Sequence, residues 1–168
     1  MRAYYDARAG EYDDWWLGRG LYAERDRPGW HEEVERLCEV VAGLEPRRVL
    51  DVASARLPDA RLVQGDAVPL PFADGAFDRV FTGHFYGHLL PDERERFVAE
   101  ARRVARELVV VDSALHDGVE PEERQERVLN DGTRHKVYKR YFRGTELADE
   151  LGGGAVLHDG RWFVAVKT

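Results

Sequence analysis

The sequence is poor in cysteine and has no long apolar run. Its 168 residues contain one cysteine, Cys38, which excludes an internal disulfide framework and any metal site built from several cysteines. The apolar runs are only a few residues long, whereas a membrane-spanning helix needs about 20, so no membrane partner is expected. The segment Met1–Asp6 has no apolar signal region, which predicts a cytoplasmic protein.

Basic residues are outnumbered by acidic ones. The chain has 25 Lys and Arg against 32 Asp and Glu, a net charge of -7, whereas proteins that bind a nucleic-acid backbone usually carry a basic face. No nucleic-acid partner is therefore expected, and small-molecule chemistry is favoured. The one basic stretch, Asn130–Phe142, is suited to an anionic substrate or to a solvated edge. The motif G-x-G-x-x-G is absent, which argues against a dinucleotide-binding oxidoreductase.

Short apolar segments alternate with amphipathic ones along the chain. This pattern predicts strands at residues 49–52, 61–64, 77–81 and 107–114, and helices at 30–46, 91–106, 120–129 and 145–151. Cys38 is expected to fill the core on the first helix, and residues 155–168 form a hairpin that turns at Asp159-Gly160. The predicted fold class is α/β, a Rossmann-like three-layer sandwich with a mostly parallel sheet and a C-terminal antiparallel hairpin, in one domain covering residues 1–168.

Small and polar residues follow each predicted strand. Because ligands bind beyond the carboxyl ends of parallel strands, a nucleotide-like pocket is predicted there. His84 and His88 are spaced as metal ligands on a helix, but neighbouring glycines oppose a helix and no third ligand is evident, so no metal is expected. The strand ends carry Asp51-Val52-Ala53, Gly65-Asp66-Ala67, Thr82-Gly83-His84 and Asp112-Ser113.

These segments, taken in order, resemble the class I S-adenosylmethionine-dependent methyltransferases, in particular the small bacterial group related to quinone-biosynthesis methyltransferases. "VLDVA" is similar to the first strand of that family, "VQGDAVPLPFADGAFDRVFTGHFYGHL" to the region of the third and fourth strands, and "ELVVVDSA" to the fifth. "YYDARAGEYDDWW" resembles the N-terminal lid of the group. The resemblance implies S-adenosylmethionine as cofactor and methyl transfer to a small-molecule acceptor.

The resemblance also implies roles for individual residues. Residues 1–28 would form an aromatic lid and residues 115–154 an acceptor-side helical region. His84 is either a base toward the substrate or a polar residue at the pocket rim, Asp66 either binds the donor or caps a turn, and Asp51 either lies near the donor or holds backbone amides. The implied donor contacts are Tyr5, Tyr12, Asp51, Val52, Ala53, Asp66, Ala67, Thr82, Gly83 and His84. The implied substrate contacts are Tyr86, His88, Tyr138 and Tyr141.

One part of the family pattern has no counterpart between Ala53 and Arg61. The glycine-rich turn, the first crossover helix and the acid that binds the ribose are missing, a unit of roughly thirty residues. Residues 54–60 reach about 24 Å fully extended, which is too short for a parallel crossover. Three explanations are open: a segment omitted from the sequence, a deletion that repacks, or a relative that has lost cofactor binding. The last would make the chain a non-catalytic binding or interaction domain.

Overall fold

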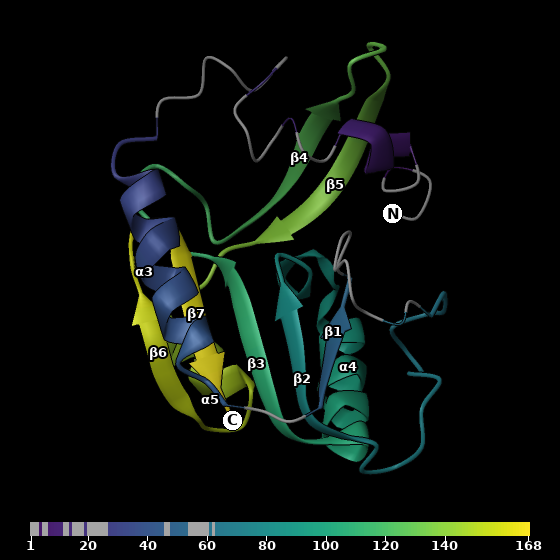
Figure 1. Cartoon of the computed structure of the whole chain (residues 1–168). Coiled ribbons are helices and arrows are strands. Elements are labelled where there is room, and N and C mark those ends of the chain that lie inside the picture. Colours follow the sequence, from purple (N-terminus) through teal and green to yellow (C-terminus); the bar gives the residue numbers. More distant parts are fainter. Residues whose placement is uncertain are drawn as a thin grey trace.

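The computed structural model covers the whole sequence and describes residues 4, 7–11, 14, 19, 27–45, 48–53, 61 and 63–168. A five-stranded sheet forms its centre, in the order β1–β2–β3–β7–β6 (Figure 1). The strands are β1 (Val49–Val52), β2 (Phe77–Gly83), β3 (Ala105–Ser113), β6 (Ala155–Asp159) and β7 (Phe163–Lys167). β1, β2 and β3 are parallel, and β7 is antiparallel to both of its neighbours. The mostly parallel sheet and the C-terminal hairpin are therefore confirmed.

Helices lie on both faces of this sheet, and a two-stranded hairpin stands beyond the carboxyl ends of β2 and β3 (Figure 1). The helices are α3 (Trp30–Ala42), α4 (Pro91–Val104) and α5 (Gly144–Glu150), with short 3-10 turns η1 (Ala9–Glu11) and η3 (Tyr86–His88). The hairpin consists of β4 (Glu122–Val128) and β5 (Arg134–Arg140). Within the described ranges, none of the helices has the length and apolar character needed to cross a membrane.

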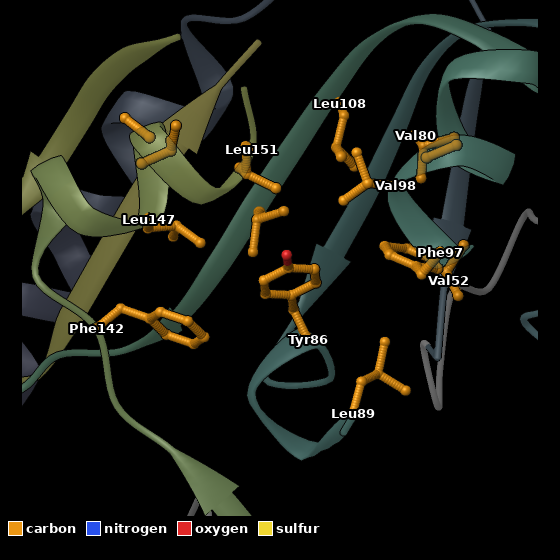
Figure 2. Close-up of a cluster of buried hydrophobic side chains, with 14 of the residues drawn as sticks. Val52, Val80, Tyr86, Leu89, Phe97, Val98, Leu108, Phe142, Leu147 and Leu151 are labelled. Atoms are coloured by element: carbon orange, nitrogen blue, oxygen red, sulfur yellow. The ribbon is translucent and has the colours of Figure 1, made fainter. Parts of the chain in front are cut away.

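Alternate residues of β3 contact different layers. Leu108 and Val110 belong to a buried cluster with side chains of α4 and α5, whereas Val109 and Val111 pack with side chains of α3. Figure 2 shows part of the first cluster, in which Leu108 lies among residues of α4, α5 and β2. A strand that is buried on both faces needs a continuous apolar run rather than an alternating one. The three expected layers are thus α3, the sheet, and α4 with α5.

The apolar side of α3 packs against β6 and β7. Leu37 is buried, and Val34 and Val41 pack against the same cluster. Cys38 is exposed, so its expected role in the core is wrong. Consecutive residues lie about 100° apart around a helix axis. Position 38 follows the buried Leu37, so its side chain points toward solvent.

Residues 120–129 were expected to form a helix, and this is wrong. β4 pairs with β5 along its whole length, from Glu122 opposite Arg140 to Val128 opposite Arg134. Glu, Arg and Gln favour helices in isolation, but the cross-strand pairs and the backbone ladder decide the conformation here. Between residues 115 and 154 only α5 is helical, so the expected helical character of this acceptor-side region is wrong as well.

The strand expected at residues 61–64 is not formed in the described part of that segment. Arg61 and residues 63–66 lie outside any strand, and β1 is paired only with β2 among the described residues. A strand needs a neighbour for its backbone groups, and the family strand that would stand beside β1 has no counterpart in the sequence. Only residues 54–60 separate Ala53 from Arg61 in the full sequence, so the explanation by an omitted segment is wrong.

Candidate active site

A cavity of about 500 Å³ lies at the carboxyl ends of β2 and β3. Residues from these strand ends, the β4–β5 hairpin, the start of α3 and the β6–β7 turn line it. Three of the predicted site residues, His84, His88 and Tyr141, are brought together there. This position agrees with the expectation that a parallel sheet binds its ligand beyond the carboxyl ends of its strands.

A buried ion pair joins the hairpin to the sheet at this cavity. Asp112 of β3 has no exposed surface, and Lys139 of β5 is 3% exposed. The ammonium of Lys139 donates to the Asp112 carboxylate, and the backbone amides of Gly87 and Ser113 donate to it at 2.8 Å each. Burial alone would raise the pKa of Asp112, but the charge and hydrogen bond of Lys139, together with the influence of His84 and His88, outweigh burial and lower the pKa to about 2. The pair therefore stays ionised and links β3, β5 and η3.

Two neutral histidines stand beside the ion pair. Nδ1 of His88 lies 2.7 Å from the backbone carbonyl oxygen of Tyr138, and since that oxygen can only accept, Nδ1 carries the proton. Nδ1 of His84 lies 3.5 Å from Oγ of Ser113. Burial lowers the pKa of His88 to about 3 and that of His84 to about 4. Both imidazoles are therefore uncharged near pH 7 and present one acceptor nitrogen each.

The chain turns sharply where β1 and β2 end. Ala53 has φ 69° and His84 has φ 54°, in the left-handed region that costs a non-glycine residue about 1–2 kcal/mol. Oγ1 of Thr82 donates to the carbonyl oxygen of Val52 at 3.2 Å, which holds the two strand ends together. Strained backbone of this kind is concentrated at functional sites.

The other donor-side candidates are not among the residues that line the cavity. Asp66 is exposed, and Ala67 is half-buried. Tyr5 and Tyr12 lie outside the described residues. The remaining candidates stand at the ends of β1 and β2: Asp51, Val52, Ala53, Thr82 and Gly83.

Two residues predicted to contact the substrate make their contacts within the protein. The hydroxyl of Tyr86 donates to Glu150 at 2.9 Å, and its ring belongs to the buried cluster in Figure 2. Burial raises the pKa of Tyr86, as does the Glu150 carboxylate. The hydroxyl of Tyr138 accepts from Nη1 of Arg94 at 3.2 Å. Neither tyrosine lines the cavity, and their contact with a substrate stays a prediction.

A polar network covers the hairpin side of the cavity. Gln125 donates to the hydroxyl of Tyr141 and to Glu123, and Arg127 donates to the side-chain oxygen of Gln125. Burial raises the pKa of Tyr141 to about 12, and the Glu123 carboxylate adds to the effect. The phenol therefore stays protonated at any physiological pH.

Aromatic side chains form another wall. The ring of Phe163 lies 5.4 Å from that of His84 and 5.9 Å from that of Trp30, measured between centroids. Glu33 of α3, only 3% exposed, accepts from the backbone amides of Trp162 and Phe163 at 3.0 and 2.9 Å. A helix carboxylate thus fixes the β6–β7 turn that carries the aromatic wall.

Three residues of the site were not assigned individual roles from the sequence. Asp112 was noted only as a strand end beside the predicted pocket, and Lys139 only as part of the basic stretch. Arg127 was not singled out, since the strand that carries it resembles a helix in composition. In the part of the chain that the structure describes, no group of His, Cys, Asp and Glu could hold a metal ion.

Comparison with known proteins relates part of the chain to a described family. The sequence pattern of a family described as "Methyltransferase domain" matches residues 29–110, which include α3, β1, β2 and most of β3. This match covers just under half of the 168 residues. The closer relation to the quinone-biosynthesis group stays a prediction.

Solved structures share the fold of this protein. The structure of DhpI in complex with SAH matches with a TM-score of 0.70 and 22% identity, covering 98% of this chain and 92% of that one. A Burkholderia thailandensis 1,6-didemethyltoxoflavin-N1-methyltransferase, with bound 1,6-didemethyltoxoflavin and S-adenosylhomocysteine, matches with a TM-score of 0.55 and 14% identity, covering 99% and 88%. At these identities the likeness concerns the fold alone.

A curated relative matches a shorter part of the chain. Ajmaline N-methyltransferase of Rauvolfia serpentina is 38% identical over 72 residues, which are 39% of this chain and 24% of the relative. The chain thus spans about a quarter of the length of the curated relative it matches.

Proposed function

We propose that this protein transfers a methyl group from S-adenosylmethionine to a small-molecule acceptor bound in the cavity between the sheet and the β4–β5 hairpin. The observation that carries the proposal is the position of the cavity, at the carboxyl ends of β2 and β3. The family match over residues 29–110 supports it, as do the two solved complexes with S-adenosylhomocysteine (SAH).

The strand ends beside the cavity fit part of a donor site. The ends of β1 and β2 lie side by side, with Val52 opposite Thr82. Each strand is followed by a residue whose backbone has a left-handed conformation, Ala53 after β1 and His84 after β2. Asp51, Val52, Ala53, Thr82, Gly83 and His84 are the described residues that would hold S-adenosylmethionine. When bound, it supplies an electrophilic methyl group on a sulfonium, so the protein has mainly to align the acceptor and exclude water.

The cavity residues orient the acceptor and its proton. Neutral His84 and His88 accept a hydrogen bond from the nucleophilic group, and their low pKa values favour this orienting role over net removal of a proton. The Asp112–Lys139 pair holds the hairpin over the cavity. Residues 115–154, which supply the hairpin, are therefore proposed as the acceptor side of a single domain.

The absent glycine-rich turn favours a second candidate, a methyltransferase-like binding domain without catalysis. The family residues that would surround the donor between its first and third strands have no counterpart in the sequence. If the chain repacks around the deletion and keeps the donor site, it should bind S-adenosylhomocysteine. If the deletion abolishes the donor site, it should not.

Calorimetric titration with S-adenosylhomocysteine separates the two candidates. Methyl transfer requires saturable binding that D51N weakens, because Asp51 stands at the strand end assigned to the donor. Asp117 is exposed on a loop. The matched control is therefore D117N, which should bind S-adenosylhomocysteine as tightly as the wild type. A parallel incubation with methyl-labelled S-adenosylmethionine and a library of small acceptors should yield a labelled product. Absence of binding at millimolar concentration would establish the non-catalytic domain.

A further inference from the structure

Basic side chains reach the cavity from four places in the chain. Arg8 comes from the N-terminal segment, Arg27 precedes α3, Arg127 comes from β4 and Lys139 from β5, and all of them line the cavity. The protein as a whole is acidic, with a net charge of -7, so basic groups collected in one cavity are a local feature. We infer that the acceptor carries an oxyanion, a carboxylate or a phosphate-type group, and that Arg127 binds it. This inference rests on the proposed function for the acceptor's role as substrate.

Arg127 has an unused donor in the cavity wall. Its Nη2 donates to Gln125, but its Nε is buried and has no hydrogen-bond partner among the described residues. A buried donor of a charged group without an acceptor is unfavourable. An oxyanion accepts from Nε and from a terminal nitrogen of the same guanidinium together, in the paired geometry that arginine provides.

The acidic side chains of the cavity are engaged elsewhere. Glu126 forms an ion pair with Arg134 on the neighbouring strand. Glu123 accepts from Gln125 and interacts with Tyr141. Asp112, below the cavity, is neutralised by Lys139. The carboxylates therefore have cationic or polar partners of their own, and none of these contacts involves the Nε of Arg127.

The arginines of the cavity are near enough to influence the two histidines. After burial, the charges of Asp112 and Lys139 act in opposite directions on the pKa of each imidazole, and Arg27 lowers the pKa of His84 while Arg127 lowers that of His88. Both guanidinium groups thus contribute positive potential where the imidazoles lie. A positive potential in a partly desolvated cavity attracts and holds anions.

Binding of small probe anions tests this inference without knowledge of the natural acceptor. Wild-type protein with labelled histidines is titrated with sodium acetate, inorganic phosphate and acetamide at constant ionic strength, and the imidazole NMR signals are followed. Acetate and acetamide have nearly the same shape, so only the charge differs. We expect saturable shifts of His84 and His88 with at least one anion and none with acetamide. The tighter anion identifies the oxyanion class.

Variants of Arg127 provide the control for position. R127M should weaken anion binding about tenfold or more, since a hydrogen bond to a charged group contributes about 1.5–3 kcal/mol. R124M, on the exposed side of the same strand, should bind like the wild type. R127K keeps the positive charge but replaces the planar guanidinium with an ammonium, so it should weaken anion binding by a smaller factor than R127M. This variant keeps the test decisive if R127M does not fold. Equal binding of acetate and acetamide, or unchanged anion binding in R127M and R127K, overturns the inference.

Titration with S-adenosylhomocysteine on the same samples keeps the two proposals apart. S-adenosylhomocysteine binding without an anion response overturns the oxyanion inference and leaves methyl transfer standing. An anion response that depends on Arg127, without S-adenosylhomocysteine binding, supports the anion site and refutes methyl transfer.

Discussion

Replacing Asp112 by Asn tests the buried ion pair that joins the β4–β5 hairpin to the central sheet. The variant D112N keeps the size of the side chain and one acceptor for the amides of Gly87 and Ser113. It leaves the ammonium of Lys139, which is 3% exposed, without its negative partner. K139M makes the complementary change and leaves a buried carboxylate without its cation.

The magnitude follows from the burial of both partners. Breaking a buried pair by removing one charge costs about 3–5 kcal/mol, a large part of the 5–15 kcal/mol that typically stabilises a domain. The double variant D112N/K139M removes both charges, so it avoids the uncompensated ion. We therefore expect its loss to be clearly smaller than the sum of the single losses, with a coupling free energy of roughly 2 kcal/mol or more.

Urea unfolding at pH 7, followed by tryptophan fluorescence, measures these free energies. The matched control is the exposed ion pair between Glu126 and Arg134 on the same hairpin, whose side chains are 51% and 66% exposed. The cycle of E126Q and R134M should give a coupling below about 1 kcal/mol. If D112N and K139M prove additive within about 0.5 kcal/mol, the ion pair has no role in holding the hairpin and our reasoning is wrong.

The same carboxylate predicts a dependence on acid. The pKa of Asp112 is lowered from 3.8 to about 2, so the folded state holds the ionised form and the unfolded state takes up the proton first. The stabilisation, on the order of 2 kcal/mol, is complete above the unfolded pKa and is lost as the pH falls toward 2. D112N should lack this component of the acid loss, which urea unfolding at pH 3 and pH 6 can detect.

Three further predictions concern residues around the cavity. G87A should destabilise the protein by about 1–3 kcal/mol, because an added Cβ would lie 2.6 Å from a backbone oxygen of β5, whereas G83A, with only an ordinary contact at 3.7 Å, should cost less. His84 and His88, with pKa values of about 4 and 3, should show no imidazole NMR titration between pH 5.5 and 8. Because the unfolded chain protonates them near pH 6.5, stability should also fall as the pH drops below that value; a titration midpoint above 6 in the folded protein would contradict their burial. E33Q should lower the melting temperature by several degrees, because the carboxylate accepts three backbone amides of the β6–β7 turn; the same change at an exposed glutamate of α3 should have little effect, and equal losses would disprove the special role.

Local patterns predicted most of the sheet and its helices because the apolar and turn residues within each of these segments favour the structure that the segment adopts. The apolar run Leu108–Val111 forms the part of β3 that is buried on both faces, and Pro91 begins α4. The turn at Asp159-Gly160 connects β6 to β7. In each case the spacing of apolar residues in the sequence matches the spacing of buried side chains in the structure.

The failures share a different cause. Residues 122–128 form a strand because β5 pairs with them, and a pairing partner six residues further along the chain is not visible in the composition of the segment itself. The strand expected at 61–64 fails for the opposite reason, since its apolar residues lack the neighbouring strand that would complete it. Secondary structure in both places is decided by long-range contacts rather than by propensity.

The sequence by itself determined the fold class and the edge of the sheet where the candidate site was expected, because the alternation of strands and helices and the polar residues at strand ends are local patterns. Only the tertiary structure decided which residues share the cavity. It brought Asp112 and Lys139 into a buried pair, placed His84, His88 and Arg127 around the same cavity, and moved Tyr86 into the core. The physical reason is that burial and charge pairing depend on contacts between segments far apart in the chain, and these arise only when the hairpin folds over the sheet.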